Sequence, residues 1–251
     1  MSADGDGGGC RSIEGRRDGY RERPSRLSGA VLWVKRAPGG VPEAPRPVLP
    51  DGCTDLLWMD GRLIVAGPDT TAHIPAARPG SVVVGLRFAP GQGPAVVGVP
   101  AHVLRDRRVP LTELWPRDLV ERLTGTVAGT GSPGRVLEEI ALRRLREAAG
   151  PSDPARGVIA AALGRGRSVA EVAGTVGVGE RQLHRRCLEA FGYGPKMLAR
   201  VLRLVRALEL ARGGMPYADV AARAGYADQA HLAREVKALA GAPLGVIAAP
   251  G

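Results

Sequence analysis

Two short stretches in the last third of the chain carry side chains that are suited to bind the edges of nucleic-acid bases. The first is Arg181-Gln182-Leu183-His184-Arg185-Arg186-Cys187, and a weaker echo of it spans residues 228–234. Each follows a short apolar helix pattern and a turn that contains glycine. An α-helix fits the major groove of DNA, where arginine bonds guanine bidentately and glutamine does the same for adenine. The pattern therefore predicts two recognition helices of helix-turn-helix units.

Helical spacing separates the core positions of these two stretches from their outward positions. Leu183 and Cys187 are four residues apart, as are Leu232 and Val236, so each pair is expected to face the core. One such helix alone would favour a merely solvated surface, but two copies favour DNA binding. The residues on the opposite faces are the predicted base readers: Arg181, His184, Arg185, Gln229, His231 and Arg234.

The segment between the two stretches is predicted to be one long helix, at residues 195–212, ended by a glycine pair. Its predicted apolar stripe is Leu198, Val201, Leu202, Val205 and Leu208. Lys196, Arg200 and Arg203 are spaced i, i+4, i+7 on the same helix. We expect these three cations to contact DNA phosphate, which adds affinity without sequence information.

The flanking residues extend the motif over about a hundred positions. The pieces are Val172-Ala173, Gly177-Val178-Gly179-Glu180, Phe191-Gly192-Tyr193-Gly194-Pro195-Lys196, Arg203, Ala207, Leu210, Asp219-Val220-Ala221, Ala224-Gly225-Tyr226-Ala227-Asp228-Gln229 and Gly241-Ala242-Pro243. With them, residues 154–247 closely resemble the DNA-binding domain of AraC/XylS-type bacterial transcription regulators. The resemblance implies two helix-turn-helix subdomains that enter successive major grooves on one face of DNA, with the base readers named above.

Three positions depart from that family. Gly179 stands where the family usually has a Ser or Thr cap, a replacement that costs only a few tenths of a kcal/mol. Cys187 and Val236 stand where the family usually has Phe, which predicts less filled cores but the same fold.

The rest of the chain is predicted to divide into a disordered tail at residues 1–24 and a front domain at residues 25–150, ahead of the DNA-binding domain at residues 151–251. Short strands alternate with Pro- and Gly-rich turns up to about residue 109, among them an Asp60-Gly61 hairpin turn, and helices follow. The predicted fold class is α+β: a small β-barrel or sandwich with trailing helices, then an all-α domain.

Three motifs support a function for the front domain: Leu49-Pro50-Asp51-Gly52-Cys53-x-Asp55-Leu56, Ala66-Gly67-Pro68 and Gly85-Leu86-Arg87-Phe88-x-Pro90-Gly91. Through them residues 27–145 resemble the sensor region of one subgroup of these regulators. The resemblance implies a cupin-like barrel that dimerises, binds an effector, or both. Trp33, Trp58 and Arg87 are the candidate effector contacts; the alternatives are core packing for the tryptophans and an internal Asp51 or Asp55 partner for Arg87.

The overall charge agrees with a polyanionic partner. The 251 residues carry a formal net charge of +10, although only Lys35, Lys196 and Lys237 are lysines, a bias that also fits a GC-rich bacterial source. Placement is more informative: residues 151–251 hold 14 basic and 8 acidic residues, against 21 and 17 in residues 1–150. The excess is denser where the recognition helices are predicted.

The sequence thus predicts a bacterial, sequence-specific transcription regulator that binds double-stranded DNA and has no catalytic activity. It is expected to be a cytoplasmic, nucleoid-associated homodimer with no cofactor, no metal and no membrane segment, in contact with RNA polymerase if it is an activator. The isolated His73 and His102 do not form a metal-ligand pattern.

Two other functions remain open from the sequence. One is a DNA-repair alkyl-acceptor enzyme fused to the DNA-binding part, which would need clustered cysteines where this chain has Cys10, Cys53 and Cys187. The other is a regulator that responds to no ligand and uses its front domain only to dimerise.

Overall fold

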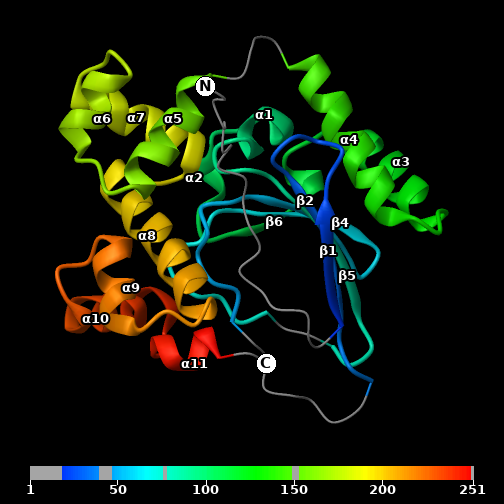
Figure 1. Ribbon diagram of the computed structural model, residues 1–251. Helices are drawn as coiled ribbons and strands as arrows, with labels where there is room; N and C mark the ends of the chain where they lie inside the picture. Colours follow the sequence, from blue (N-terminus) through cyan, green and yellow to red (C-terminus); the bar gives the residue numbers. More distant parts are fainter. Residues whose placement is uncertain (1–18, 40–46, 76–77, 149–152, 250–251) are drawn as a thin grey trace, which may run out of the picture.

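The computed structural model describes residues 19–39, 47–75, 78–148 and 153–249. In these residues an antiparallel sheet with helices α1–α4 beside it forms the N-terminal front domain. A bundle of helices α5–α11 lies on one side of that sheet (Figure 1). The predicted α+β class, with an N-terminal sheet domain followed by a helical domain, is confirmed. No helix in the described ranges has the length and apolar character that crossing a membrane requires.

The described strands form one six-stranded sheet, ordered β1-β2-β5-β3-β4-β6 with every neighbour antiparallel. The strands are β1 (Tyr20–Pro24), β2 (Val31–Arg36), β3 (Asp55–Met59), β4 (Arg62–Ala66), β5 (Val82–Arg87) and β6 (Arg108–Pro110). Asp60 and Gly61 join β3 to β4 with φ of 50° and 72°, the left-handed pair that a two-residue type I′ hairpin requires. The predicted hairpin is confirmed. The described strands do not close into the predicted barrel: the sheet is open, because β1 and β6 lie at its two edges and are not paired with each other.

Strand β1 corrects the predicted boundary of the N-terminal tail. Residues 1–18 lie outside the described part, but Tyr20–Pro24 pair with Val31–Lys35 of β2. Only Tyr20 of this strand is buried, and its ring stacks on Trp33 with centroids 6.0 Å apart. An edge strand with only one buried side chain shows almost no alternation of apolar and polar residues. The sequence of residues 20–24 therefore does not distinguish this strand from a polar tail.

The front helices close the other side of the core. They are α1 (Gly93–Val97), α2 (Ala101–Leu104), the 3₁₀ turn η1 (Leu111–Glu113), α3 (Arg117–Ala128) and α4 (Pro133–Glu147). In α4 Leu137, Ile140 and Ala141 are buried in one cluster with the strand residues Leu56 and Leu86. Gly134 lets this helix approach β2, since a β-carbon there would lie 2.5 Å from a methyl of Leu32.

In the described residues the helical domain consists of two units of three helices each, α5–α7 and α9–α11, which both pack on the shared helix α8. The helices are α5 (Ala155–Gly164), α6 (Val169–Thr175), α7 (Glu180–Phe191), α8 (Pro195–Arg212), α9 (Tyr217–Ala224), α10 (Gln229–Ala240) and α11 (Leu244–Ala248). Leu198 and Val201 of α8 pack into the first unit's cluster, and Leu204 and Leu208 pack into the second's. Of the predicted stripe, Leu198, Val201 and Leu208 are fully buried, while Leu202 and Val205 are partly buried.

A buried carboxylate ties strand β1 to the rest of the front domain. Glu138 of α4 has no exposed surface and accepts hydrogen bonds from the two terminal guanidinium nitrogens of Arg23, at 3.0 and 2.9 Å. It also accepts the backbone N–H of Arg26 at 3.0 Å. Burial works against ionisation of Glu138, yet the hydrogen bonds from Arg23 and Arg26 leave its pKa below the ordinary value.

We expect Arg23→Ala to lower the free energy of unfolding by about 1–3 kcal/mol, because it leaves a buried carboxylate with one donor fewer. The folded pKa is depressed, so this contribution is present above the unfolded value of about 4.3 and is lost as the pH falls through the folded pKa. Urea titrations at pH 7 and near pH 3 measure both effects. Arg21→Ala, an exposed arginine of the same strand, is the matched control and should stay within about 0.5 kcal/mol of wild type.

Candidate nucleic-acid interface

The first helix-turn-helix unit begins at a capping box on α6. The Ser168 side chain accepts the backbone N–H of Glu171 at 3.3 Å, and the Glu171 carboxylate accepts the backbone N–H of Ser168 at 2.8 Å. These reciprocal bonds form a capping box. The turn to α7 passes through Gly177 at φ 68°, and α7 begins at Gly179 with no side-chain cap.

Helix α7 separates its core face from its outer face as predicted. Leu183 and Cys187 have no exposed surface, whereas Arg181, His184 and Arg185 are exposed. The His184 ring lies against the turn that follows the helix, because a β-carbon on Gly194 would come within 2.7 Å of its Nε2. The first unit thus presents two arginines and one histidine to solvent from a helix that its buried face holds in place.

The second unit repeats this arrangement on a firmer helix start. Asp228 precedes α10, and its Oδ1 accepts the backbone N–H of His231 at 2.6 Å. Sequence reasoning missed this cap, although an Asp directly before an apolar helix pattern is its usual signal. Gln229 and Arg234 are exposed, and Leu232 and Val236 are buried in the unit's core.

His231 is less available to a base than the sequence suggested. It is half-buried, and its Nδ1 accepts the backbone N–H of Ala227 at 3.3 Å. Its ring meets Tyr226 edge-on, with centroids 5.4 Å apart. An imidazole whose Nδ1 is an acceptor carries its proton on Nε2 when neutral, so that nitrogen is the one left to donate to a partner.

The three cations on α8 do not share one role. Lys196 is exposed. Arg200 binds both oxygens of Glu235 on α10, at 2.8 and 3.2 Å, and its hydrogen bond is the main cause that lowers the pKa of Glu235. Arg203 donates to the backbone carbonyl of Gly225 at 3.3 Å. The two arginines join α8 to the second unit, and these contacts compete with the phosphate role predicted for them, which stays a prediction from the sequence. The i, i+4, i+7 spacing predicted a shared helix face but not the partners Glu235 and Gly225.

The candidate effector residues of the front domain are engaged inside it. Trp33 donates from Nε1 to Asp55 at 2.7 Å. Arg87 is buried, with its Nε 3.3 Å from Asp51 and 3.4 Å from Asp55, so the internal-partner alternative is confirmed. Trp58 is partly buried against the sheet core.

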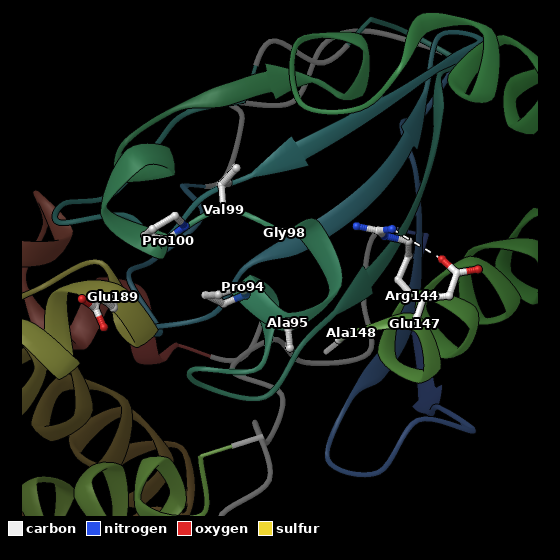
Figure 2. A pocket seen from close by; sticks show the side chains of 9 residues that line it. All are labelled: Pro94, Ala95, Gly98, Val99, Pro100, Arg144, Glu147, Ala148 and Glu189. Carbon is white, nitrogen blue, oxygen red and sulfur yellow. Dashed lines mark hydrogen bonds and ion pairs between the residues drawn. The ribbon is translucent and has the colours of Figure 1, made fainter. Parts of the chain in front are cut away.

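A pocket of about 440 Å³ lies elsewhere, beside α1, the segment that follows it and α4, with Glu189 of α7 on its rim (Figure 2). In Figure 2 the Arg144 and Glu147 side chains stand on one side of it, joined by an ion pair, and Glu189 approaches from the other. None of Trp33, Trp58 and Arg87 lines this pocket.

The cysteines that the structure describes offer no nucleophile. Cys187 has no exposed surface, and burial raises its pKa to about 12, so it is a protonated thiol at neutral pH. Cys53 is buried. Within the described residues no group of three or more His, Cys, Asp or Glu side chains is placed to hold a metal ion.

Two family models match the chain. Residues 172–248, which include α7 and α10, match a helix-turn-helix domain, and residues 30–110 match a domain of unknown function, DUF6597. A search of the curated proteins found no match.

Among solved structures the chain is similar to ToxT of Vibrio cholerae. The apo form of a ToxT variant has 12% identity and a TM-score of 0.47, covering 90% of this chain and 98% of that one. A second ToxT structure has 9% identity and a TM-score of 0.47, covering 93% and 100%. Wild-type ToxT with an unsaturated fatty acid has 11% identity and a TM-score of 0.42, covering 90% and 96%.

We expect Arg200→Ala to lower the free energy of unfolding by about 1 kcal/mol, since it removes a two-pronged hydrogen-bonded ion pair that is partly exposed. A double-mutant cycle with Glu235→Ala measures the coupling directly. Additive single effects, with no coupling energy, would show that the pair does not join α8 to α10.

Proposed function

We propose that this chain, whose C-terminal region is a helix-turn-helix DNA-binding domain of the AraC type, is a transcription regulator that reads two successive major-groove segments. The observation that carries the proposal is the pair α7 and α10. Each is held by a buried stripe against its own unit, and each presents hydrogen-bonding side chains to solvent.

The length of α8 agrees with this arrangement. At 1.5 Å per residue its 18 residues extend about 27 Å, with Leu198 and Val201 packed in the first unit and Leu204 and Leu208 in the second. Successive major-groove faces on one side of DNA are about 34 Å apart. The two recognition helices, both packed on this one helix, are proposed to enter neighbouring turns of the groove.

The front domain leaves the reading faces open. It contacts the C-terminal end of α7, where a β-carbon on Gly91 would approach the Phe191 ring and one on Gly192 would approach Pro68. Arg181 and Arg185, at the other end and on the other face of α7, are exposed with the front domain in place. This geometry supports DNA binding by the whole chain.

Base reading is assigned to Arg181, Arg185, Gln229 and Arg234 as the main contacts, with His184 and His231 in supporting positions. Lys196 is assigned to phosphate. For a small-molecule effector we prefer the pocket of Figure 2 to Trp33 and Arg87, because its lining includes both the front domain and Glu189 of α7. Homodimer formation, contact with RNA polymerase and a place on the bacterial nucleoid stay predictions from the sequence.

Selection of bound DNA from a random pool by the purified chain tests the proposal. A specific duplex with two short conserved segments about one helical turn apart is the expected result. Binding that shows no sequence preference at physiological salt would contradict the proposed function. The selected duplex also serves as the probe for the variants below.

We expect Arg185→Ala and Arg234→Ala each to weaken binding to the selected duplex by about 1–3 kcal/mol and to relax preference at one segment only, because a bidentate arginine contact reads one base pair. Repeating the selection with each variant shows which segment has relaxed. Arg117→Ala, on α3 away from the helical domain (Figure 1), is the matched control and should bind as wild type does. Unchanged affinity in both variants would remove the reader assignment.

Lys196→Ala should instead weaken binding to every duplex by a similar factor and reduce the slope of log affinity against log salt by about one, because it removes one phosphate contact. Titrations at several salt concentrations measure that slope. Arg200→Ala, whose guanidinium is held by Glu235, should leave the slope unchanged.

A further inference from the structure

The segment that leaves β4, residues 67–73, is held firmly by its own domain. Asp69 accepts two hydrogen bonds from Arg108 of β6, both at 2.6 Å. Asp106 accepts the backbone N–H of Thr70 at 2.6 Å and its hydroxyl at 2.9 Å. A loop with this many charge-assisted bonds to one domain moves with that domain as a rigid part.

The same segment bonds to both helix-turn-helix units. The Tyr193 hydroxyl, in the turn between α7 and α8, donates to the backbone carbonyl of Asp69 at 2.6 Å. Three residues further along, the backbone N–H of Ala72 donates to the carbonyl of Leu239 at the end of α10, at 2.7 Å. One short stretch of the front domain thus holds the end of the first unit and the end of the second.

The surroundings of Tyr193 are closely packed. It is 1% exposed, and burial raises the pKa of its phenol well above the ordinary value, with Asp51 and Asp69 adding to the effect. Arg105 donates to the carbonyl of the preceding Gly192 at 3.3 Å. A β-carbon on Gly192 would lie 2.7 Å from the Pro68 ring, so the turn and the segment are in direct contact.

Helix α8 holds the two units through different side chains. Each unit packs its own cluster on its own part of that helix, with Leu198 and Val201 in the first and Leu204 and Leu208 in the second. A third body that bonds to both units opposes rotation of either. The contact leaves Arg185 and Arg234 exposed, so it sets the geometry of the reading faces without covering them.

We propose that residues 67–73 act as a spacer that sets the relative position of α7 and α10, and that Tyr193 is the positioning residue through which the front domain determines the spacing of the two DNA segments. The inference rests on the proposed function. It assigns to the front domain a part in choosing the DNA site, whether or not an effector is bound.

The test uses the full chain, the selected duplex, and duplexes with one base pair added or removed between the two segments. Tyr193→Phe removes only the hydroxyl. Ala72→Pro removes the other N–H donor. Tyr217→Phe, whose side chain is 39% exposed on α9, is the matched control. Hydrogen exchange at the Ala72 amide reports the second bond independently of DNA.

For Tyr193→Phe we expect affinity for the selected duplex to fall by about three- to tenfold, the factor that one hydrogen bond of ordinary net strength gives. The preference for the selected spacing over the altered spacings should fall by a similar factor. Exchange at the Ala72 amide should become faster, because the two bonds support each other. Ala72→Pro should relax the spacing preference in the same direction, and Tyr217→Phe should match wild type.

Specific binding with an unchanged spacing profile in both Tyr193→Phe and Ala72→Pro would overturn the inference and leave the proposed function intact. The same holds for a uniform loss of affinity at all spacings, which would indicate only a structural role for Tyr193. A wild-type chain that selects no duplex would instead overturn the proposed function itself.

Discussion

The helical domain depends on a single helix that is buried from two directions. Leu198, Val201, Leu204 and Leu208 of α8 all have no exposed surface, yet they belong to two different clusters. Fully burying one such side chain contributes about 1.5–3 kcal/mol, so neither unit can lose α8 and keep its core. The units are therefore expected to fold together, and a disturbance that reaches α8 reaches both reading faces.

Periodicity predicted the reading faces well because the face on which a residue lies depends only on its position along its own helix. On α7 and α10 a period of 3.6 residues separates Leu183 and Leu232 from the outward Arg185 and Arg234, and the structure shows the same separation. Which residue of another helix contacts a polar face depends on the tertiary fold. Arg200 lies on the face that the spacing indicates, but only the fold brings Glu235 of α10 to it.

The front domain shows where sequence reasoning ends. Its hairpin at Asp60-Gly61 follows from turn chemistry alone. Strand β1 does not, because four of its five residues are exposed and its stability comes from backbone pairing and from Glu138, more than a hundred positions away. Likewise the sequence cannot distinguish an effector contact from an internal ion pair for Arg87, whereas the fold places Asp51 and Asp55 against it.

The residue at the end of α7 has a consequence for how this domain can vary. Gly192 ends the helix at φ 79°, a backbone conformation that other residues resist, and it also lies where Pro68 and the Ala101 carbonyl leave no room for a β-carbon. Helix termination and domain contact thus coincide at one position. Insertion of even one residue before Gly192 would rotate the helix end by about 100° and move the glycine away from Pro68 and Ala101. The length of the first recognition helix is therefore constrained by its contact with the front domain at Pro68 and Ala101.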